Sequence, residues 1–133
     1  MVINVKSKGN NFERDLVKKL NTLLPGSEWK RIPSSGAIGT IMHEPSLAGD
    51  LNGRLQHFPT KFKVEAKVGY GGAKQFTLKK EWLDKIKQEA LRTFSIPFLL
   101  GRFSGSRSGV EEFVVLDLDT FVELLKLLDK ASK

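Results

Sequence analysis

The segment KFKVEAKV, residues 61–68, shows the alternation that decides how this chain folds. Its apolar side chains are Phe62, Val64, Ala66 and Val68, and its charged side chains are Lys61, Lys63, Glu65 and Lys67. Because side chains of a strand point alternately to its two faces, the segment predicts a β-strand with one apolar face. A partner strand is predicted over residues 50–55, with a turn near Pro59, and a glycine-rich break follows over residues 69–73.

Helices are predicted on both sides of this strand pair. Apolar residues recur at helical spacing over residues 12–24 and 78–93, and a last helix follows over 120–130. The Asn10–Asn11 pair offers a cap for the first helix, and Asp119 offers one for the last.

Three further strands and a long loop complete the pattern. The strands are predicted over residues 29–32, 97–103 and 112–118, and a loop rich in Pro, Ser and Gly over 33–49. The predicted order is αβββαββα. This order favours an α/β fold, a mixed α+β sheet flanked by helices, in a single domain over residues 1–133.

Composition narrows the classes of function. The chain has 22 Lys and Arg against 15 Asp and Glu, a net charge of +7, which favours nucleic acid first and an acidic membrane surface second as partner, or else a plain solvated basic surface. The absence of cysteine excludes disulfides and thiolate sites, and the isolated His43 and His57 do not indicate zinc. With no apolar signal core at its start and no apolar run of membrane-spanning length, the chain is expected to be cytoplasmic, with no membrane partner.

Two acids and a lysine carry the candidate chemistry. Glu65 and Lys67 share one face of the predicted strand, although plain solvated faces alternate in the same way. Asp50 begins the partner strand, where it either meets Glu65 across the pair or only caps a turn. Two carboxylates at such a short distance repel each other unless a cation lies between them. Mg²⁺ needs few protein ligands because it keeps several waters, so the carbonyl of Ala66 would complete such a site. Mn²⁺ is a possible substitute.

A third acid, Glu13, lies on the first predicted helix. It shares a helical face with Val17, Leu20 and Leu24, at the edge of the apolar stripe. There its carboxylate either points into a site beneath the helix or, in the first helical turn, simply suits the helix dipole.

Basic and hydroxyl side chains elsewhere are candidate contacts to DNA phosphates, although surface solubility or a plain Ser/Gly turn would explain any one of them. Phosphate contacts make binding steeply salt-dependent and selective for shape. The candidates are Lys6, Lys8, Arg14, Arg31, Ser34, Lys74, Arg102 and Arg107.

Four short motifs, in this order along the chain, resemble the PD-(D/E)XK nuclease superfamily. They are KGNNFER at 8–14, SSG at 34–36, GDL at 49–51 and VEAK at 64–67. Within the superfamily the chain is most similar to the archaeal-type Holliday junction resolvases, including viral relatives, over roughly residues 6–103. Gly49 stands where the family pattern has proline, and the stretch before it is longer than in the family.

This resemblance implies a restriction-endonuclease-like fold and a Mg²⁺-dependent endodeoxyribonuclease acting on four-way junctions as a homodimer. It implies that Glu13, Asp50 and Glu65 bind the metal. Lys67 would assist the attacking water or the charged phosphate, and Ser35 would contribute from the loop.

Two alternatives stay open. One is another nuclease of the superfamily that acts on linear, flap or mismatched DNA, and the other is a non-catalytic nucleic-acid-binding module with structural acids. The apolar residues of the last helix suit either a dimer interface or core packing; they are Phe121, Leu124, Leu125 and Leu128.

Overall fold

The computed structural model describes residues 5–32, 50–69, 74–105 and 108–133, with side chains from residue 9 onward. The predicted loop over residues 33–49 lies outside these ranges. The described elements follow the order αβββαββα, as the sequence predicts.

A five-stranded mixed sheet forms the centre of the structure, with its strands side by side in chain order. The first three strands pair antiparallel: β1 (Glu28–Arg31), β2 (Leu51–Arg54) and β3 (Phe62–Val68). β3 then pairs parallel with β4 (Ile96–Arg102), which pairs antiparallel with β5 (Glu112–Val115). The predicted α/β class with a mixed sheet is therefore confirmed.

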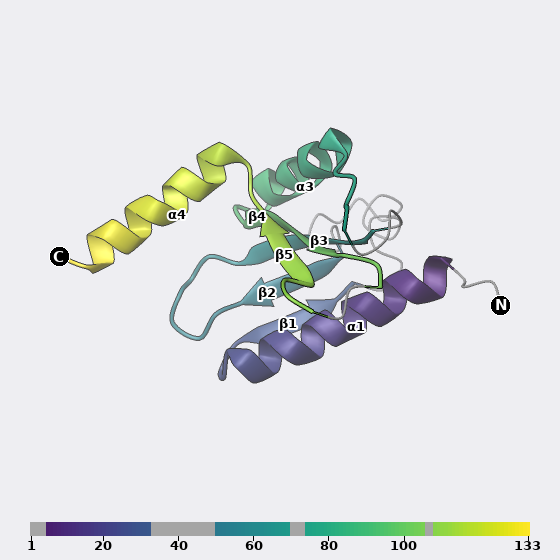
Figure 1. The fold of residues 1–133 in the computed structure, drawn as a ribbon. Helices are drawn as coiled ribbons and strands as arrows, with labels where there is room; N and C mark the ends of the chain where they lie inside the picture. Colours follow the sequence, from purple (N-terminus) through teal and green to yellow (C-terminus); the bar gives the residue numbers. More distant parts are fainter. Residues whose placement is uncertain (1–4, 33–49, 70–73, 106–107) are drawn as a thin grey trace.

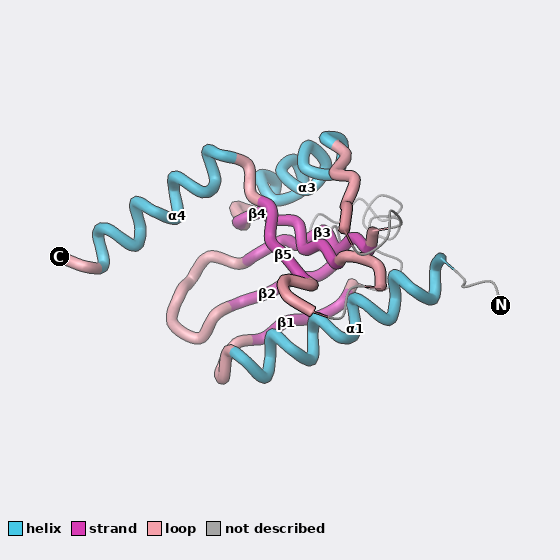
Figure 2. Tube along the Cα trace, in the orientation of Figure 1, coloured by secondary structure: helices cyan, strands magenta, loops and turns pink. Residues whose placement is uncertain are grey.

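The described residues form three helices, of which two pack on this sheet. α1 (Val5–Leu23) and α3 (Lys80–Arg92) cover opposite faces of it, and α3 is the crossover that a parallel β3–β4 pair requires (Figure 1). α4 (Leu118–Ala131) instead runs away from the sheet to the C-terminus (Figure 2). None of the helices in the described ranges combines the length and apolar character needed to cross a membrane.

The two faces of β3 bury different side chains. The face under α1 contributes to an apolar core made of Phe12, Leu16, Trp29, Leu51, Val64 and Leu100. The face under α3 carries Lys63 and Glu65, which are only 3% and 2% exposed, beside the buried Ile86 and Ala90 of the helix. Glu65 thus lies in the interior, beneath a helix.

The start of α1 differs from the prediction. The helix begins at Val5 and passes through Asn10, which does not cap it. Instead the Oδ1 atom of Asn10 accepts a hydrogen bond from Nη2 of Arg31 at 3.0 Å, an interaction with a distant strand. Glu13 is therefore not in the first turn of α1, and the helix dipole does not explain it.

The start of α4 also differs from the prediction. Asp117, rather than Asp119, is the cap, and its carboxylate accepts a hydrogen bond from the backbone N–H of Thr120 at 3.1 Å. β5 ends at Val115, two residues before this cap, and is shorter than the predicted strand over 112–118.

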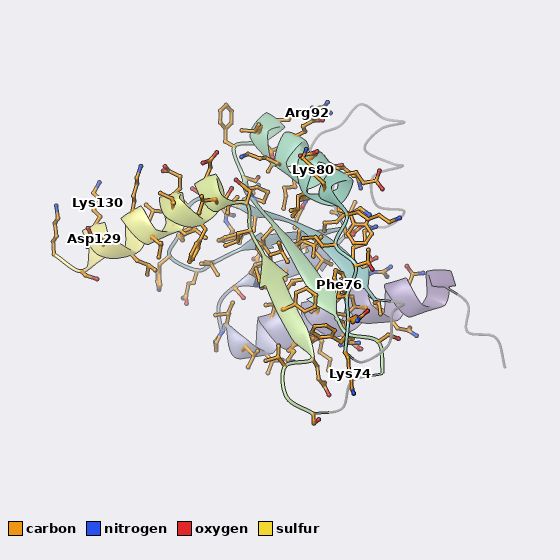
Figure 3. The ribbon with its side chains drawn as sticks, turned by 45° about the horizontal axis from the view of Figure 1, so that its top comes forward. Lys74, Phe76, Lys80, Arg92, Asp129 and Lys130 are labelled. Atoms are coloured by element: carbon orange, nitrogen blue, oxygen red, sulfur yellow. The ribbon has the colours of Figure 1, made fainter. Side chains whose placement is uncertain are left out.

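An aromatic cluster packs at the β5 edge of the sheet. Phe76, in the segment before α3, lies 4.8 Å between ring centroids from Phe113 of β5 and 6.2 Å from Trp82 of α3 (Figure 3). Gly101 allows this packing, because a Cβ atom there would lie 2.4 Å from the Phe113 ring. The cluster holds α3 and β5 in place around the end of β3.

Candidate active site

Asp50 is fixed by backbone hydrogen bonds at the start of β2. Its N–H donates to the carbonyl of Val64 at 2.9 Å, and its carbonyl accepts from the N–H of Ile32 at 2.9 Å. Its carboxylate turns toward β3, where Oδ2 accepts from the N–H of Ala66 at 2.8 Å. The pairing of Leu51 with Val64, carried one residue further, sets Asp50 beside Glu65.

Glu65 lies between two lysines. Its Oε1 is 3.4 Å from Nζ of Lys67, and its Oε2 is 3.4 Å from Nζ of Lys85 on α3. Burial raises the pKa of Glu65, and the charge of Asp50 raises it further, while both lysines act in the opposite direction. The net shift is upward, because desolvation disfavours the charged form of a carboxyl group.

Lys67 lies between a carboxylate and an aromatic ring. Its Nζ is 4.9 Å from the ring centroid of Trp82, which is within the range of a cation–π contact. About a third of its side chain (32%) remains exposed. The ammonium is thus held in place on one side and open to an incoming group on the other.

Glu13 approaches the same region from α1. Its side chain is 13% exposed, and its Oε1 accepts a hydrogen bond from Nε of Arg31 at 3.3 Å. Burial raises the pKa of Glu13, and the charge of Asp50 adds to this, whereas Arg31 and Lys67 oppose it. Because Coulomb interactions weaken with distance, Asp50 and Lys67 both lie within electrostatic reach of Glu13.

The donor set suits a hard divalent cation, although the ligands do not form a closed cage. Within the described ranges, no three Asp, Glu or His side chains are grouped tightly enough to hold a metal ion as they lie. Asp50 and Glu65 nevertheless offer buried carboxylate oxygens on neighbouring strands, the ligand type that Mg²⁺ takes. Each Glu65 oxygen faces an ammonium at 3.4 Å, which supplies the positive charge that a metal ion would bring.

Two charged residues of α3, Lys85 and Glu89, belong to this cluster and were not predicted from the sequence. Lys85 contacts Glu65 and lies 3.9 Å from Glu89, whose side chain is 12% exposed. Burial raises the pKa of Glu89, while the charges of Lys85 and Lys63 lower it. In this cluster three ammonium groups balance three carboxylates, so the buried groups carry no large net charge. The ammonium groups belong to Lys63, Lys67 and Lys85, and the carboxylates to Asp50, Glu65 and Glu89.

The spacing of these residues in the sequence indicates that they share one side of the helix. Trp82, Lys85 and Glu89 are spaced three and four residues apart, so they share one side of α3, next to the apolar stripe at Ile86. The stripe alone predicts a buried helix face, but it does not say that β3 lies beneath it.

The candidate DNA contacts fall into several groups. Arg14 and Lys74 are exposed, and Arg31 is engaged with Glu13 and Asn10. The guanidinium of Arg102 donates to Glu112 at 2.8 Å and lies 4.5 Å from the Phe12 ring centroid, so it holds α1 against the sheet. Side chains of Lys6 and Lys8 are not described, and Ser34, Ser35 and Arg107 lie outside the described residues.

The fold, together with an Asp and a Glu-x-Lys on adjacent central strands, defines the class of PD-(D/E)XK nucleases. The chain belongs to the family described as "Phage putative PDDEXK endonuclease", whose sequence profile matches residues 4–131. Endonucleases are hydrolases that act on nucleic acid, and nucleases of this class generally use a divalent metal ion.

The structure is similar to that of Hjc, a Holliday junction resolvase from the hyperthermophilic archaeon Archaeoglobus fulgidus. The TM-score is 0.53 at 15% sequence identity, with 86% of this chain and 93% of that chain covered. At this identity the likeness establishes the fold. No curated protein sequence gives a significant match to the chain.

Proposed function

We propose that this protein is a Mg²⁺-dependent, structure-selective DNA endonuclease that resolves four-way junctions. The observation that carries the proposal is the position of Asp50, whose carboxylate is held by the N–H of Ala66 beside the buried Glu65. Buried, mutually repelling carboxylates next to a lysine have little value for stability, and they are what a metal-assisted phosphodiesterase requires.

In this proposal Asp50, Glu65 and the carbonyl of Ala66 hold the metal ion, with Glu13 beside them. When bound, Mg²⁺ supplies a Lewis acid for the phosphate and lowers the pKa of a bound water. Mn²⁺ would substitute, since it takes the same oxygen ligands.

The residues of the chain provide orientation and charge. Lys67 is held by Glu65 and Trp82 with part of its side chain exposed, so its ammonium can donate to a phosphate oxygen and stabilise the charge that develops there. Water forms the new P–O bond, the bond from phosphorus to the 3′ oxygen breaks, and that oxygen takes up a proton. The products are a 5′-phosphate and a 3′-hydroxyl.

Selectivity for a branched substrate follows from phosphate contacts and from pairing of two sites. Exposed cations such as Arg14 and Lys74 contact the backbone, so binding is expected to weaken steeply with salt. A homodimer would present two sites to the two symmetric strands of a junction. The likeness to an archaeal Holliday junction resolvase supports this choice of substrate.

The test is cleavage of a labelled four-way junction and of a linear duplex of the same sequence, each with and without Mg²⁺. The proposal expects rapid cutting of the junction only when Mg²⁺ is present, and far slower cutting of the duplex. Equal rates on both substrates would contradict junction selectivity while leaving the nuclease assignment intact.

A second candidate is an endonuclease for linear, flap or mismatched DNA. It is favoured by the family description, which names an endonuclease and no branched substrate. Flap and mismatched duplexes in the same assay distinguish it. Tight binding with no cutting of any substrate would point instead to a non-catalytic binding module.

A further inference from the structure

Phe94, in the turn that follows α3, has an unusual backbone and an uncovered side chain. Among the described residues other than glycine it alone has a positive φ, of 53°, and its side chain is 90% exposed. The end of the helix imposes this backbone, because the N–H groups of Thr93 and Ser95 both donate to the carbonyl of Ala90, at 3.1 and 2.9 Å. Glycine is the usual residue at such a position, since a Cβ atom is strained there.

Folding stability does not explain a phenylalanine at position 94. A positive φ is unfavourable for a bulky side chain, and a ring that stays in water gains nothing from burial. Glycine would remove both the backbone strain and the exposed ring. A residue that is unfavourable for folding on two counts indicates a contact with something outside the folded chain.

Phe94 lines a groove between the sheet and the end of α3, which Arg92 marks in Figure 3. The groove has a volume of about 380 Å³, and Asn52 of β2 and Lys63 of β3 also line it. Asn52 pairs with Lys63 on one side and with the exposed Lys30 of β1 on the other, so these three residues form a row across the sheet. The row places two positive charges and an amide beside an exposed aromatic ring.

This row lies directly beside the candidate active site. Asn52 is two residues from Asp50, and Lys63 is two residues from Glu65 on β3, so both pairs lie on the α3 side of the sheet. Two residues of a strand span about 7 Å. The groove is therefore within reach of a nucleotide close to the phosphate held at the candidate active site.

The chemistry of the groove suits an unpaired nucleotide. Bases stack on exposed aromatic side chains, and lysines attract phosphate groups. In a continuous duplex the faces of each base are covered by its neighbours, so only a base outside the stack reaches an aromatic ring of the protein. A protein partner is disfavoured, because charged residues are depleted at the centre of protein interfaces and this groove is lined by lysine.

We propose that this groove binds an unpaired nucleotide of the DNA substrate, with its base stacked on Phe94 and its backbone drawn to Lys30. The inference rests on the proposed function, because it takes DNA as the substrate. It goes further by naming the feature of the DNA that is recognised. Bulges, flaps and opened branch points offer an unpaired nucleotide, whereas a continuous duplex does not.

The test is binding measured by fluorescence anisotropy without metal ions, so that no strand is cut. The probes are a labelled duplex with one unpaired nucleotide and the fully paired duplex of the same flanking sequence. The parent should bind the first probe about tenfold more tightly, and Phe94→Gly should bind both probes equally. Phe94→Tyr, which keeps an aromatic ring, should retain the preference. The matched control is Leu91→Ala, which should behave like the parent, because Leu91 is 66% exposed on α3 but does not line the groove.

A thermal melt of Phe94→Gly separates stacking from a structural role. The variant should unfold at the parental temperature or above it, because it removes a strained residue. Loss of the preference together with a lowered melting temperature would overturn the proposal, as would a Phe94→Gly variant that keeps the preference. Equal binding of the two probes by a parent that cuts four-way junctions would overturn this inference alone. A parent that binds no DNA would contradict the proposed function as well.

Discussion

Both faces of β3 lie under a helix, yet one face buries apolar side chains and the other buries charged side chains. Toward α1 the strand presents Val64 to a core of apolar side chains. Toward α3 it presents Lys63 and Glu65, both almost fully buried among charged groups. Burial of apolar surface stabilises a fold, whereas burial of paired charges seldom does so. The comparison teaches that the α1 face holds the fold together and that the α3 face is retained for another purpose.

The largest effect is expected from removing the ammonium group of Lys67, at the end of the charged face of β3. Lys67→Ala should reduce junction cleavage about 10³-fold, equivalent to roughly 4 kcal/mol of transition-state stabilisation. The measurement is single-turnover cleavage at saturating protein. Lys61→Ala is the matched control, since Lys61 is an exposed lysine just before the same strand. Parental rates from Lys67→Ala would remove this residue from the chemistry.

The apolar face should respond in the opposite way. Leu16→Ala, at a side chain 3% exposed in the α1 core, should lower the free energy of unfolding by about 3 kcal/mol through lost burial and a cavity. Urea denaturation measures the loss, and cleavage per folded molecule should remain near the parent. Leu23→Ala, at a residue 64% exposed on the same helix, should have little effect. If both variants were equally stable, the α1 face would not be the main source of stability.

A smaller effect is expected at the second lysine on Glu65. Lys85→Ala leaves Oε2 of Glu65 without its ammonium, so the carboxylate is held less firmly, and cleavage should fall about tenfold. Lys80→Ala, on the same helix but 87% exposed, serves as the control in the same assay. Equal rates for the two variants would place Lys85 outside the mechanism.

The smallest expected effects are contributions to folding stability that change with pH, and they should have opposite signs at Glu89 and Glu112. Burial raises the pKa of Glu89 above its ordinary 4.5, so its charge destabilises the folded state at neutral pH and this cost disappears as the pH falls. At Glu112, burial alone would raise the pKa, but hydrogen bonds from Lys19 and Arg102 outweigh this effect and lower the pKa. Its stabilisation is therefore present above pH 4.5 and lost as the pH falls through the lowered value.

Thermal melts of Glu89→Gln and Glu112→Gln measure this difference. At pH 7 the first should equal or exceed the parent and the second should fall below it, each by less than about 1 kcal/mol. Near pH 3 both differences should shrink. Two variants that move in the same direction at pH 7 would contradict the assigned pKa shifts.

The sequence predicts the fold well where the pattern is local. Alternation over residues 61–68 predicts β3, and helical periodicity predicts each of the helices that the structure describes. The start of α1 was missed because Asn10 bonds to Arg31, 21 residues away, in place of a cap. The start of α4 was missed by two residues, since Asp117 and Asp119 are equally good caps by composition and only Asp117 bonds Thr120.

For the candidate site, sequence reasoning names residues of two strands and Glu13 of α1, but it misses the residues of α3. Glu65 and Lys67 follow from the alternation of one strand, and Asp50 from its partner strand. Lys85 and Glu89 could not be placed, because the crossing of α3 over β3 is set by tertiary packing and not by the helix's own pattern.

The most direct test of the central claim is Mg²⁺-dependent cleavage and binding by Glu65→Gln. This variant keeps the shape of the buried side chain and removes its charge. It should bind a labelled four-way junction with close to parental affinity in a gel-shift assay, yet give no cleavage above the level seen without Mg²⁺. Cutting at the parental rate by a folded Glu65→Gln protein would contradict the claim that the charged face of β3 is a nuclease centre.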